Sequence, residues 1–279
     1  MKTYAYGFPR LGENREFKKA IESYWKNPEE DLLYNKLEAL EKEMLTGYSC
    51  CVDEYPSAEM TKYDHMLDMA IMLGLYKPKS LNEYFELCRG KNALEMTKWF
   101  NTNYHYLVQN FDGVKPADLA LNWNKAADYA RKTDAPPFLL GPFTFLKLSK
   151  GIRKKDFPDF MSRIASLYRE ALTEISSIHI HEPAFVLEVS REEIDTIKKA
   201  YSEIAADFLE DLCELPLSAI GLDFVHGEDN LPRIQGMDFP KSITLIAGLV
   251  DGQNVFRTVF NQALEVLRRL NPKVEKLAL

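Results

Sequence analysis

Short apolar runs alternate with longer amphipathic stretches along most of this 279-residue chain. The apolar runs predict strands at Tyr4–Phe8, Ser49–Val52, Tyr104–Val108, Phe138–Gly141, Ile178–His181, Ala219–Val225 and Thr244–Leu249. The amphipathic stretches predict helices at Pro28–Tyr48, Tyr63–Leu73, Phe157–Ser177, Ser190–Leu209 and Arg257–Leu270. Ser190 followed three residues later by Glu193 forms a capping box at the start of the fourth helix. Strands that alternate with helices in this way are typical of a parallel sheet with crossover helices.

The predicted strands tend to finish in polar or special residues, such as Asp53, His105, Glu182 and Asp223. In a (β/α)8 barrel the carboxyl ends of the strands carry the chemistry. The pattern therefore predicts an α/β fold of the (β/α)8 TIM-like barrel class, with residues 1–279 as a single domain. A doubly wound open sheet is the rival, but the chain has no Gly-x-Gly-x-x-Gly turn to support dinucleotide binding.

Composition excludes several classes of partner. Hydrophobic residues make up 46% of the chain and charged residues 28%, as in a globular protein with ample material for a core. The net charge of −7 argues against nucleic acid or an anionic membrane as the main partner. The start has no signal-peptide core, no apolar run reaches 18 residues, and four cysteines make no disulfide framework. We therefore expect a cytoplasmic protein.

Two pairs of residues could be taken for a metal site. His179 and His181 share one face of a predicted strand, and Glu182 follows them. Two histidines alone do not build a zinc site, and histidines packed at a barrel rim are the alternative. Cys50 and Cys51 are adjacent on a predicted strand and would face opposite sides, which favours small buried hydrophobes over shared ligation. The sequence predicts no metal site.

The first twenty residues carry the strongest candidate for binding. The first strand breaks at residues 7–9 and opens a helix whose first turns contain Arg15, Lys18 and Lys19. Backbone N–H groups at a helix start, together with these cations, would make a seat for an anion. The alternative is an ordinary solvated basic face.

A series of islands, in order, carries a resemblance to a known family. They are Gly7–Ala20, Tyr63–Asp68, Glu95–Tyr106, Leu139–Leu146, Glu182–Ala184, Gly221–Val225 and Gly248–Arg257. In these islands the chain resembles the amino-terminal half of cobalamin-independent methionine synthase, which moves a methyl group from a polyglutamylated 5-methyltetrahydrofolate to homocysteine. The resemblance implies that the polyglutamate tail of the folate contacts Arg15, Glu16, Phe17, Lys18 and Lys98.

The chain departs from the family pattern at single positions and in one longer segment. Phe17 replaces the usual leucine, His181 the usual aspartate and His226 the usual arginine. Near residues 210–217 the family usually has a further strand and helix. The barrel is therefore expected to be incomplete or shortened by one βα unit, and unpaired sheet edges make self-association a hypothesis.

The resemblance also implies what this chain does not supply. The family's zinc ligands (a His, two Cys and a Glu) lie in a second, carboxyl-terminal barrel, and zinc keeps homocysteine as the thiolate. We therefore expect no catalytic residue and no metal ligand or other cofactor here, and no methyl transfer by this chain alone. Its expected work is to hold the folate tail and to scaffold a catalytic half, which a separate partner would supply.

Two other functions stay open. The chain could be a non-catalytic binding or interaction module that keeps the barrel fold without folate. A small methyltransferase of the related corrinoid- or uroporphyrinogen-handling barrels is the third reading, but the chain has no His-x-Cys zinc pairing. Loss of tail binding on reversing Arg15, Lys18 and Lys98 would separate the first two readings.

Overall fold

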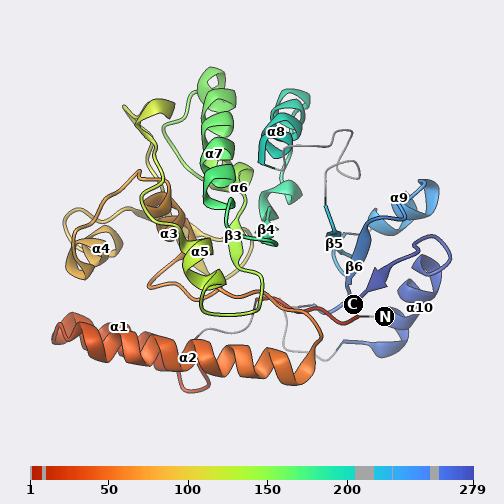
Figure 1. Cartoon of the computed structure of the whole chain (residues 1–279), viewed down its shortest axis with the longest axis horizontal. Coiled ribbons are helices and arrows are strands. Elements are labelled where there is room, and N and C mark those ends of the chain that lie inside the picture. The colour runs from red at the N-terminus through yellow and green to blue at the C-terminus, as the bar shows by residue number, and fades with distance from the viewer. Residues whose placement is uncertain (1, 8–10, 205–216, 228, 252–257) are drawn as a thin grey trace. The chain divides into compact units, whose positions relative to one another are not determined.

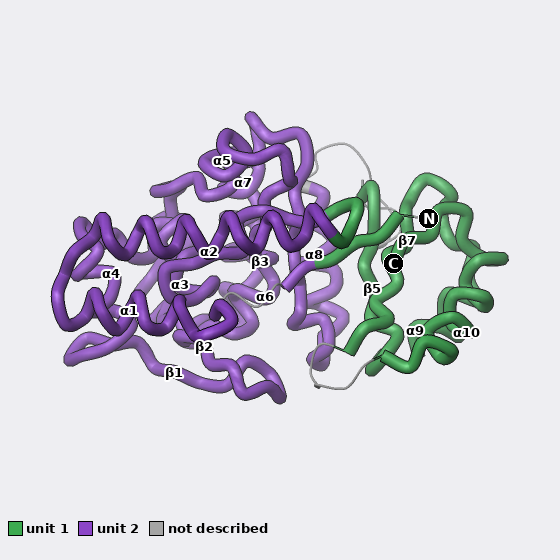
Figure 2. Tube along the Cα trace, turned by 90° about the horizontal axis from the view of Figure 1, so that it is seen from below, with its two compact units in different colours: residues 1–5, 51–54, 205–279 green, residues 6–50, 55–204 purple. Residues whose placement is uncertain are grey.

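The computed structural model describes residues 2–7, 11–204, 217–227, 229–251 and 258–279. The chain divides into two compact units (Figure 2): unit 1 comprises residues 1–5, 51–54 and 205–279, and unit 2 comprises residues 6–50 and 55–204.

Figure 1 labels the elements along the chain. The α-helices are α1 (Glu16–Lys26), α2 (Glu30–Cys51), α3 (His65–Met72), α4 (Leu81–Cys88), α5 (Lys125–Ala130), α6 (Pro142–Lys147), α7 (Phe157–Ala171), α8 (Arg191–Ile204), α9 (Asn230–Gly236) and α10 (Phe260–Leu270). The strands are β1 (Glu95–Lys98), β2 (His105–Val108), β3 (Phe138–Leu140), β4 (His179–His181), β5 (Ala219–Asp223), β6 (Thr244–Gly248) and β7 (Leu277–Ala278), and short 3₁₀ helices span Pro116–Asp118, Lys154–Asp156 and Pro183–Val186.

In unit 2, helices α1 and α2 form an antiparallel hairpin over a large apolar core (Figure 2). Each helix turns an i, i+3, i+4 stripe inward, because those positions share one helix face. The core residues from this hairpin are Phe17, Ala20, Ile21, Tyr24, Leu33, Leu37 and Leu40. They pack with α4 and with Leu107 of β2. The hairpin is therefore held by burial along its whole inner face, and its outer face is left for solvent and ligands.

The strands of unit 2 pair in two different ways. β1 and β2 form an antiparallel hairpin in which Lys98 is opposite His105. β3 and β4 are parallel, with Leu140 opposite His181. The predicted strand at residues 104–108 is thus confirmed, but its antiparallel partner β1 was not predicted. Helix α7 packs against α8, whose predicted capping box is confirmed by bonds from Ser190 N–H to Glu193 Oε2 (2.8 Å) and from Glu193 N–H to Ser190 Oγ (3.3 Å).

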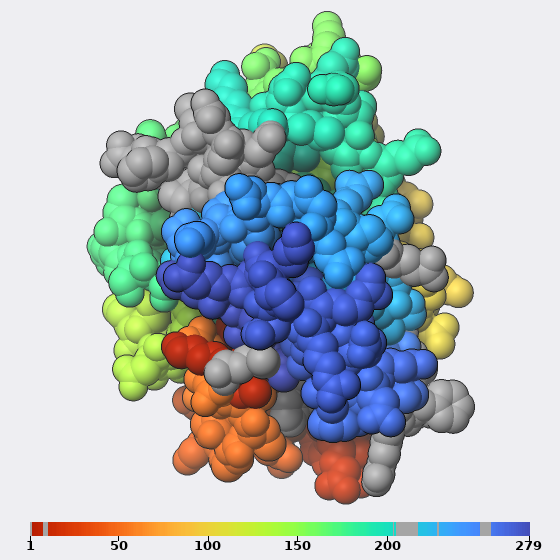
Figure 3. Space-filling model, turned by 90° about the vertical axis from the view of Figure 1, so that its right-hand side faces the viewer, coloured from red at the N-terminus to blue at the C-terminus, as the bar shows by residue number. Residues whose placement is uncertain are grey.

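Unit 1 contains a parallel sheet in the order β5-β6-β7. Lys2 forms a parallel bridge with Ala278, and Tyr4 forms one with Glu54, so that the two ends of the chain meet in this unit. Figure 3 shows the red amino-terminal residues beside the dark blue carboxyl-terminal segment. The core comes from β6, α9 and α10, with Leu245 and Leu270 fully buried. The predicted strands at 219–225 and 244–249 are confirmed with slightly shorter bounds.

The mixed α/β class is confirmed, and the described strands form three separate sheets rather than one closed barrel. Two predicted strands are wrong. Residues 49–51 belong to the end of α2, because the stripe Leu37, Leu40, Met44, Tyr48 continues the helix through them. The segment at residues 4–7 contributes an isolated bridge at Tyr4 and no strand, and Phe8 lies outside the described residues.

The cysteines follow from the same correction. Cys50 and Cys51 were expected to be buried on a strand, but they are exposed at the end of a helix. Cys88 is buried in the core, while Cys213 lies outside the described residues. The predicted helix 157–177 is too long, because α7 ends at Ala171 and the following residues form a turn. The predicted helix 190–209 is confirmed from Arg191 to Ile204, and its last five residues lie outside the described residues. None of the described helices is long and apolar enough to cross a lipid bilayer.

Candidate functional site

The start of α1 is anchored by one aromatic side chain. Phe17 is 6% exposed and belongs to the core of unit 2, and its N–H donates to Leu11 O at 3.1 Å. Arg15, at the N-cap position, has φ 62° and ψ 39°, a left-handed conformation that non-glycine residues adopt at a cost of about 1 kcal/mol or more. With Phe17 inside, Arg15 and Lys18 are exposed on the outer side of the helix. The sequence thus places two cations on a fixed helix start.

Glu16 partly fills the anion seat that the sequence predicted at this helix start. Its Oε2 accepts the N–H of Asn14 at 2.9 Å. Its own backbone N–H also donates to the carboxylate, and these bonds hold the pKa of Glu16 below its ordinary value. The Glu16 side chain can fold back over the helix start only because residue 12 is glycine. A Cβ at Gly12 would lie 2.3 Å from Glu16 Oε2. The basic character of the site therefore rests on side chains more than on free backbone N–H groups.

Lys18, on α1, forms only a weak ion pair. Lys18 Nζ lies 3.6 Å from Glu22 Oε1, and the Lys18 side chain is 57% exposed. An exposed i, i+4 pair of this kind contributes about 0.3–0.5 kcal/mol, so a ligand carboxylate can replace Glu22 at little cost. Lys18 is therefore available to an incoming anion.

Lys98 is the last residue of β1, on a hairpin whose end is stiffened by aromatic packing. The ring of Trp99 lies 5.5 Å from Tyr106 and 5.1 Å from Phe100, each edge-to-face. The Trp99 N–H donates to Tyr104 O at 2.8 Å. Lys98 itself is exposed. Within the described ranges no hydrogen bond or ion pair joins Lys98 to the start of α1, so the structure fixes each part of the predicted site separately.

The carboxyl ends of β3 and β4 form a second polar centre. Glu182 accepts the N–H groups of Phe143 (2.9 Å) and Thr144 (2.7 Å) and the hydroxyl of Tyr201 (2.7 Å). Burial raises the pKa of Glu182, and these hydrogen bonds oppose the rise. Gly141 gives the carboxylate its place, since a Cβ there would lie 2.0 Å from Glu182 Cδ. Glu182 therefore caps the first turn of α6 and has its oxygens committed there.

The two histidines of β4 are neutral packing groups. The ring of His181 lies 4.7 Å from Tyr6 and 4.5 Å from Phe138, both at steep angles. Burial lowers the pKa of His179 to about 4 and that of His181 to about 4. Among the described residues, no three His, Cys, Asp or Glu side chains gather closely enough to hold a metal ion. His226, in unit 1, lies 3.3 Å from Asp251 Oδ1, which places a carboxylate beside it.

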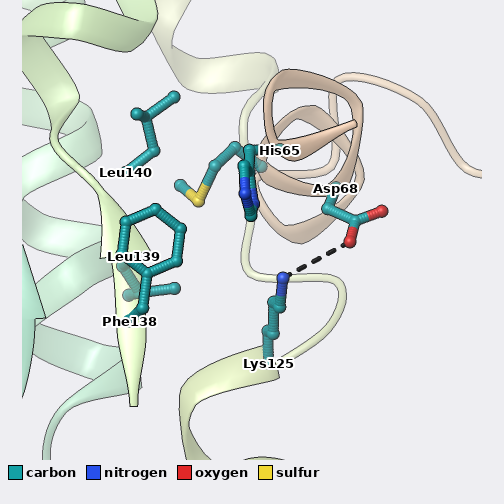
Figure 4. Close-up of a pocket in the computed structure, with 7 residues that line it drawn as sticks. His65, Asp68, Lys125, Phe138, Leu139 and Leu140 are labelled. Carbon is teal, nitrogen blue, oxygen red and sulfur yellow. Dashed lines mark hydrogen bonds and ion pairs between the residues drawn. The ribbon is translucent and has the colours of Figure 1, made fainter. Parts of the chain in front are cut away.

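A buried ion pair was missed by the reading of the sequence. Lys125 Nζ lies 3.4 Å from Asp68 Oδ2, and the two side chains are 4% and 5% exposed (Figure 4). Asp68 also accepts the hydroxyl of Tyr84 at 3.0 Å, and Lys125 donates to Met60 O at 3.3 Å. His65 lies beside Phe138 in the same small hollow, at 4.9 Å between rings. No local signal distinguishes Lys125 from a surface lysine, because its partner is 57 residues away in the chain.

Comparison with known proteins assigns the chain to one family. The family described as "Cobalamin-independent synthase, N-terminal domain" matches residues 2–275. Three similar relatives each bear the name 5-methyltetrahydropteroyltriglutamate–homocysteine methyltransferase. They come from Halalkalibacterium halodurans (35% identical, 99% of this chain and 42% of the relative), Thermotoga petrophila (36%, 97% and 41%) and Listeria monocytogenes (34%, 95% and 40%).

The alignments also measure a difference in length. This chain spans about two-fifths of the length of these relatives. The alignment with the Halalkalibacterium halodurans protein covers 315 positions, whereas the chain has 279 residues, so at least 36 positions of the relative have no counterpart here.

Proposed function

The chain belongs to the cobalamin-independent synthase family, through its N-terminal domain, and we propose that it is the amino-terminal half of a methionine synthase. In this proposal it binds the polyglutamate tail of 5-methyltetrahydrofolate and scaffolds methyl transfer to homocysteine. The contacts are Arg15, Glu16, Phe17, Lys18 and Lys98. The observation that carries the proposal is the start of α1, where buried Phe17 leaves Arg15 and Lys18 exposed and weakly engaged.

Each proposed contact has a distinct chemical task. Arg15, Lys18 and Lys98 pair with the carboxylates that each glutamate of the tail carries. Glu16 orders the loop before the helix through Asn14, and Phe17 fixes the helix start to the core. Exposed pairs contribute about 0.2–1 kcal/mol each, so binding requires several cations acting together. This explains why a tail with several carboxylates would be preferred to a single glutamate.

We also propose that residues 1–279 form one TIM-like barrel shortened by one βα unit. Within unit 1, parallel pairings run from β5 through β6 and β7 to residues 2–4 and residue 54. Within unit 2, they run from residue 57 to the start of β3 and then to β4. With residues 54–57 counted as one position, these pairings join seven positions among the described residues, and the class has eight strands. The shortfall of at least 36 positions supports this, since eight units in about 250 residues average about 30 residues each.

The zinc chemistry is assigned to another part of the enzyme. Bound zinc would keep homocysteine as a thiolate at neutral pH. The described residues do not fit such a site, since no three potential ligands gather among them. In the proposal, a catalytic half outside this chain holds zinc and homocysteine. We expect this chain, incubated with zinc and both substrates, to form no methionine, and steady-state formation of methionine would overturn that expectation.

Calorimetric titration at low salt tests the tail site directly. We expect 5-methyltetrahydrofolate with three glutamates to bind more tightly than the monoglutamate, and the preference to fade as salt is added. Lys18→Gln and Lys98→Gln should each weaken the triglutamate about 1.5- to 5-fold. Lys26→Gln, in the last turn of the same helix, is the matched control. Equal binding of the two folates, or none, would instead indicate a non-catalytic interaction module.

A further inference from the structure

A groove runs between the two helices of the α1–α2 hairpin. Its volume is about 200 Å³. Ala20, Tyr24 and Leu33 belong to the core beneath it, and Leu32, 47% exposed, stands at its α2 side. Lys19 and Ser23 line it from α1, and Lys36 lines it from α2. All of these residues lie in unit 2, on the face of the hairpin that begins at Glu16.

The two lysines and the two glutamates that line the groove differ in the contacts they make. Neither Lys19 nor Lys36 forms an ion pair within the part of the chain that the structure describes. Glu16 and Glu29 also line the groove, and each accepts a hydrogen bond from an asparagine close to it in the chain, Asn14 and Asn27 respectively. The groove thus carries two ammonium groups and two carboxylates above an apolar floor, and each carboxylate also accepts a hydrogen bond from a nearby asparagine.

We propose that this groove binds the distal part of the polyglutamate tail, so that the site selects tails longer than three glutamates. The inference rests on the proposed function, because the groove continues from Glu16, which the tail site and the groove share. Lys19 and Lys36 take the α-carboxylates of the fourth and fifth glutamates. Their ammonium groups are the specificity-determining groups for tail length.

The chemistry of a γ-glutamyl chain matches the groove. Each γ-linked unit carries one carboxylate and two methylene groups, so charge and apolar surface alternate along it. The carboxylates suit Lys19 and Lys36, and the methylene groups suit Ala20 and the two leucines. The eleven residues of α1 give the groove a length of about 16 Å, and a γ-glutamyl unit with five backbone bonds spans roughly 6 Å. Two further units therefore fit along the hairpin.

Binding of 5-methyltetrahydrofolate with three and with five glutamates, at low salt, tests the inference. We expect the pentaglutamate to bind about two- to tenfold more tightly than the triglutamate. Lys36→Gln should reduce that ratio while leaving triglutamate affinity unchanged. Ser23→Trp, which fills the groove and removes no charge, should reduce the ratio to about one. Lys42→Gln, an exposed lysine of α2 outside the groove, is the control and should leave the ratio intact.

The outcomes separate this inference from the proposed function. Equal affinity for the two tails, with the triglutamate still weakened by Lys18→Gln, would overturn the groove and keep the tail site. A loss on Lys36→Gln that is the same for both tails would also overturn it, since the residue would then act only through general charge. Failure of any polyglutamate to bind would overturn both.

Discussion

The buried pair Asp68–Lys125 allows a quantitative prediction about stability. In Lys125→Met the side chain keeps its length and apolar stem but loses the ammonium, so that Asp68 is left at 5% exposure with Tyr84 as a donor. Removing one partner of a buried ion pair typically costs about 3–5 kcal/mol. We therefore expect Lys125→Met to lose about 3–5 kcal/mol of stability.

Urea denaturation measures this loss. Asp68→Asn combined with Lys125→Met removes both charges and keeps an acceptor for Tyr84. The double variant should therefore recover to within about 1.5 kcal/mol of the unmodified chain.

An exposed pair supplies the control. Lys154 lies 2.8 Å from Glu192, and the two side chains are 81% and 76% exposed. Lys154→Met should leave the midpoint in urea nearly unchanged, because solvent screens an exposed pair. If Lys125→Met costs no more than Lys154→Met, the ammonium is not compensating a buried charge and the reasoning is refuted.

Three further predictions concern β4 and the helix caps. His179 and His181 have pKa values lowered to about 4, so the unfolded chain binds more protons than the folded chain between pH 4 and 6.5, and stability is lost as pH falls through that window. For His181 alone the loss at pH 5 is about 2 kcal/mol, and His181→Phe should flatten the pH profile measured by thermal unfolding. Gly141→Ala should lower the free energy of unfolding by more than about 2 kcal/mol, because its Cβ would displace Glu182 from the α6 cap, and an unchanged midpoint in urea would contradict this. Ser190→Ala should cost about 1 kcal/mol through loss of the α8 cap, whereas Ser190→Thr should keep most of the stability.

Patterns of neighbouring residues in the sequence were enough to predict several of the strands and helices. The Ser190 capping box and the strands near residues 138, 179, 219 and 244 follow from spacing alone. The strand predicted at residues 49–52 failed because a run of four residues cannot separate a strand from the end of a long amphipathic helix. The hairpin partner of β2 was missed because its sequence, Glu95–Lys98, has no alternation and all four residues are exposed.

One part of the candidate site could likewise be predicted from the sequence, and another part could not. The cations Arg15, Lys18 and Lys98 could be named from the sequence through the family resemblance, and the structure places them on a fixed helix start and a stiff hairpin. The fold-back of Glu16 over the helix start could not be named, because it depends on the left-handed backbone at Gly12 and the space that glycine leaves. The groove that we propose for the distal tail depends on two helices packing side by side.

The alternation of strands and helices, the family and the cations of the tail site that we propose could be read from the sequence, because these are properties of short segments read in order. The tertiary structure alone decided which polar groups are buried, which are paired and which line a groove. Lys125 and Lys36 both lie on helices, yet the Lys125 side chain is 4% exposed beside Asp68 and Lys36 lines an open groove. The difference arises because burial and pairing depend on residues that are far apart in the chain and meet only when the core forms.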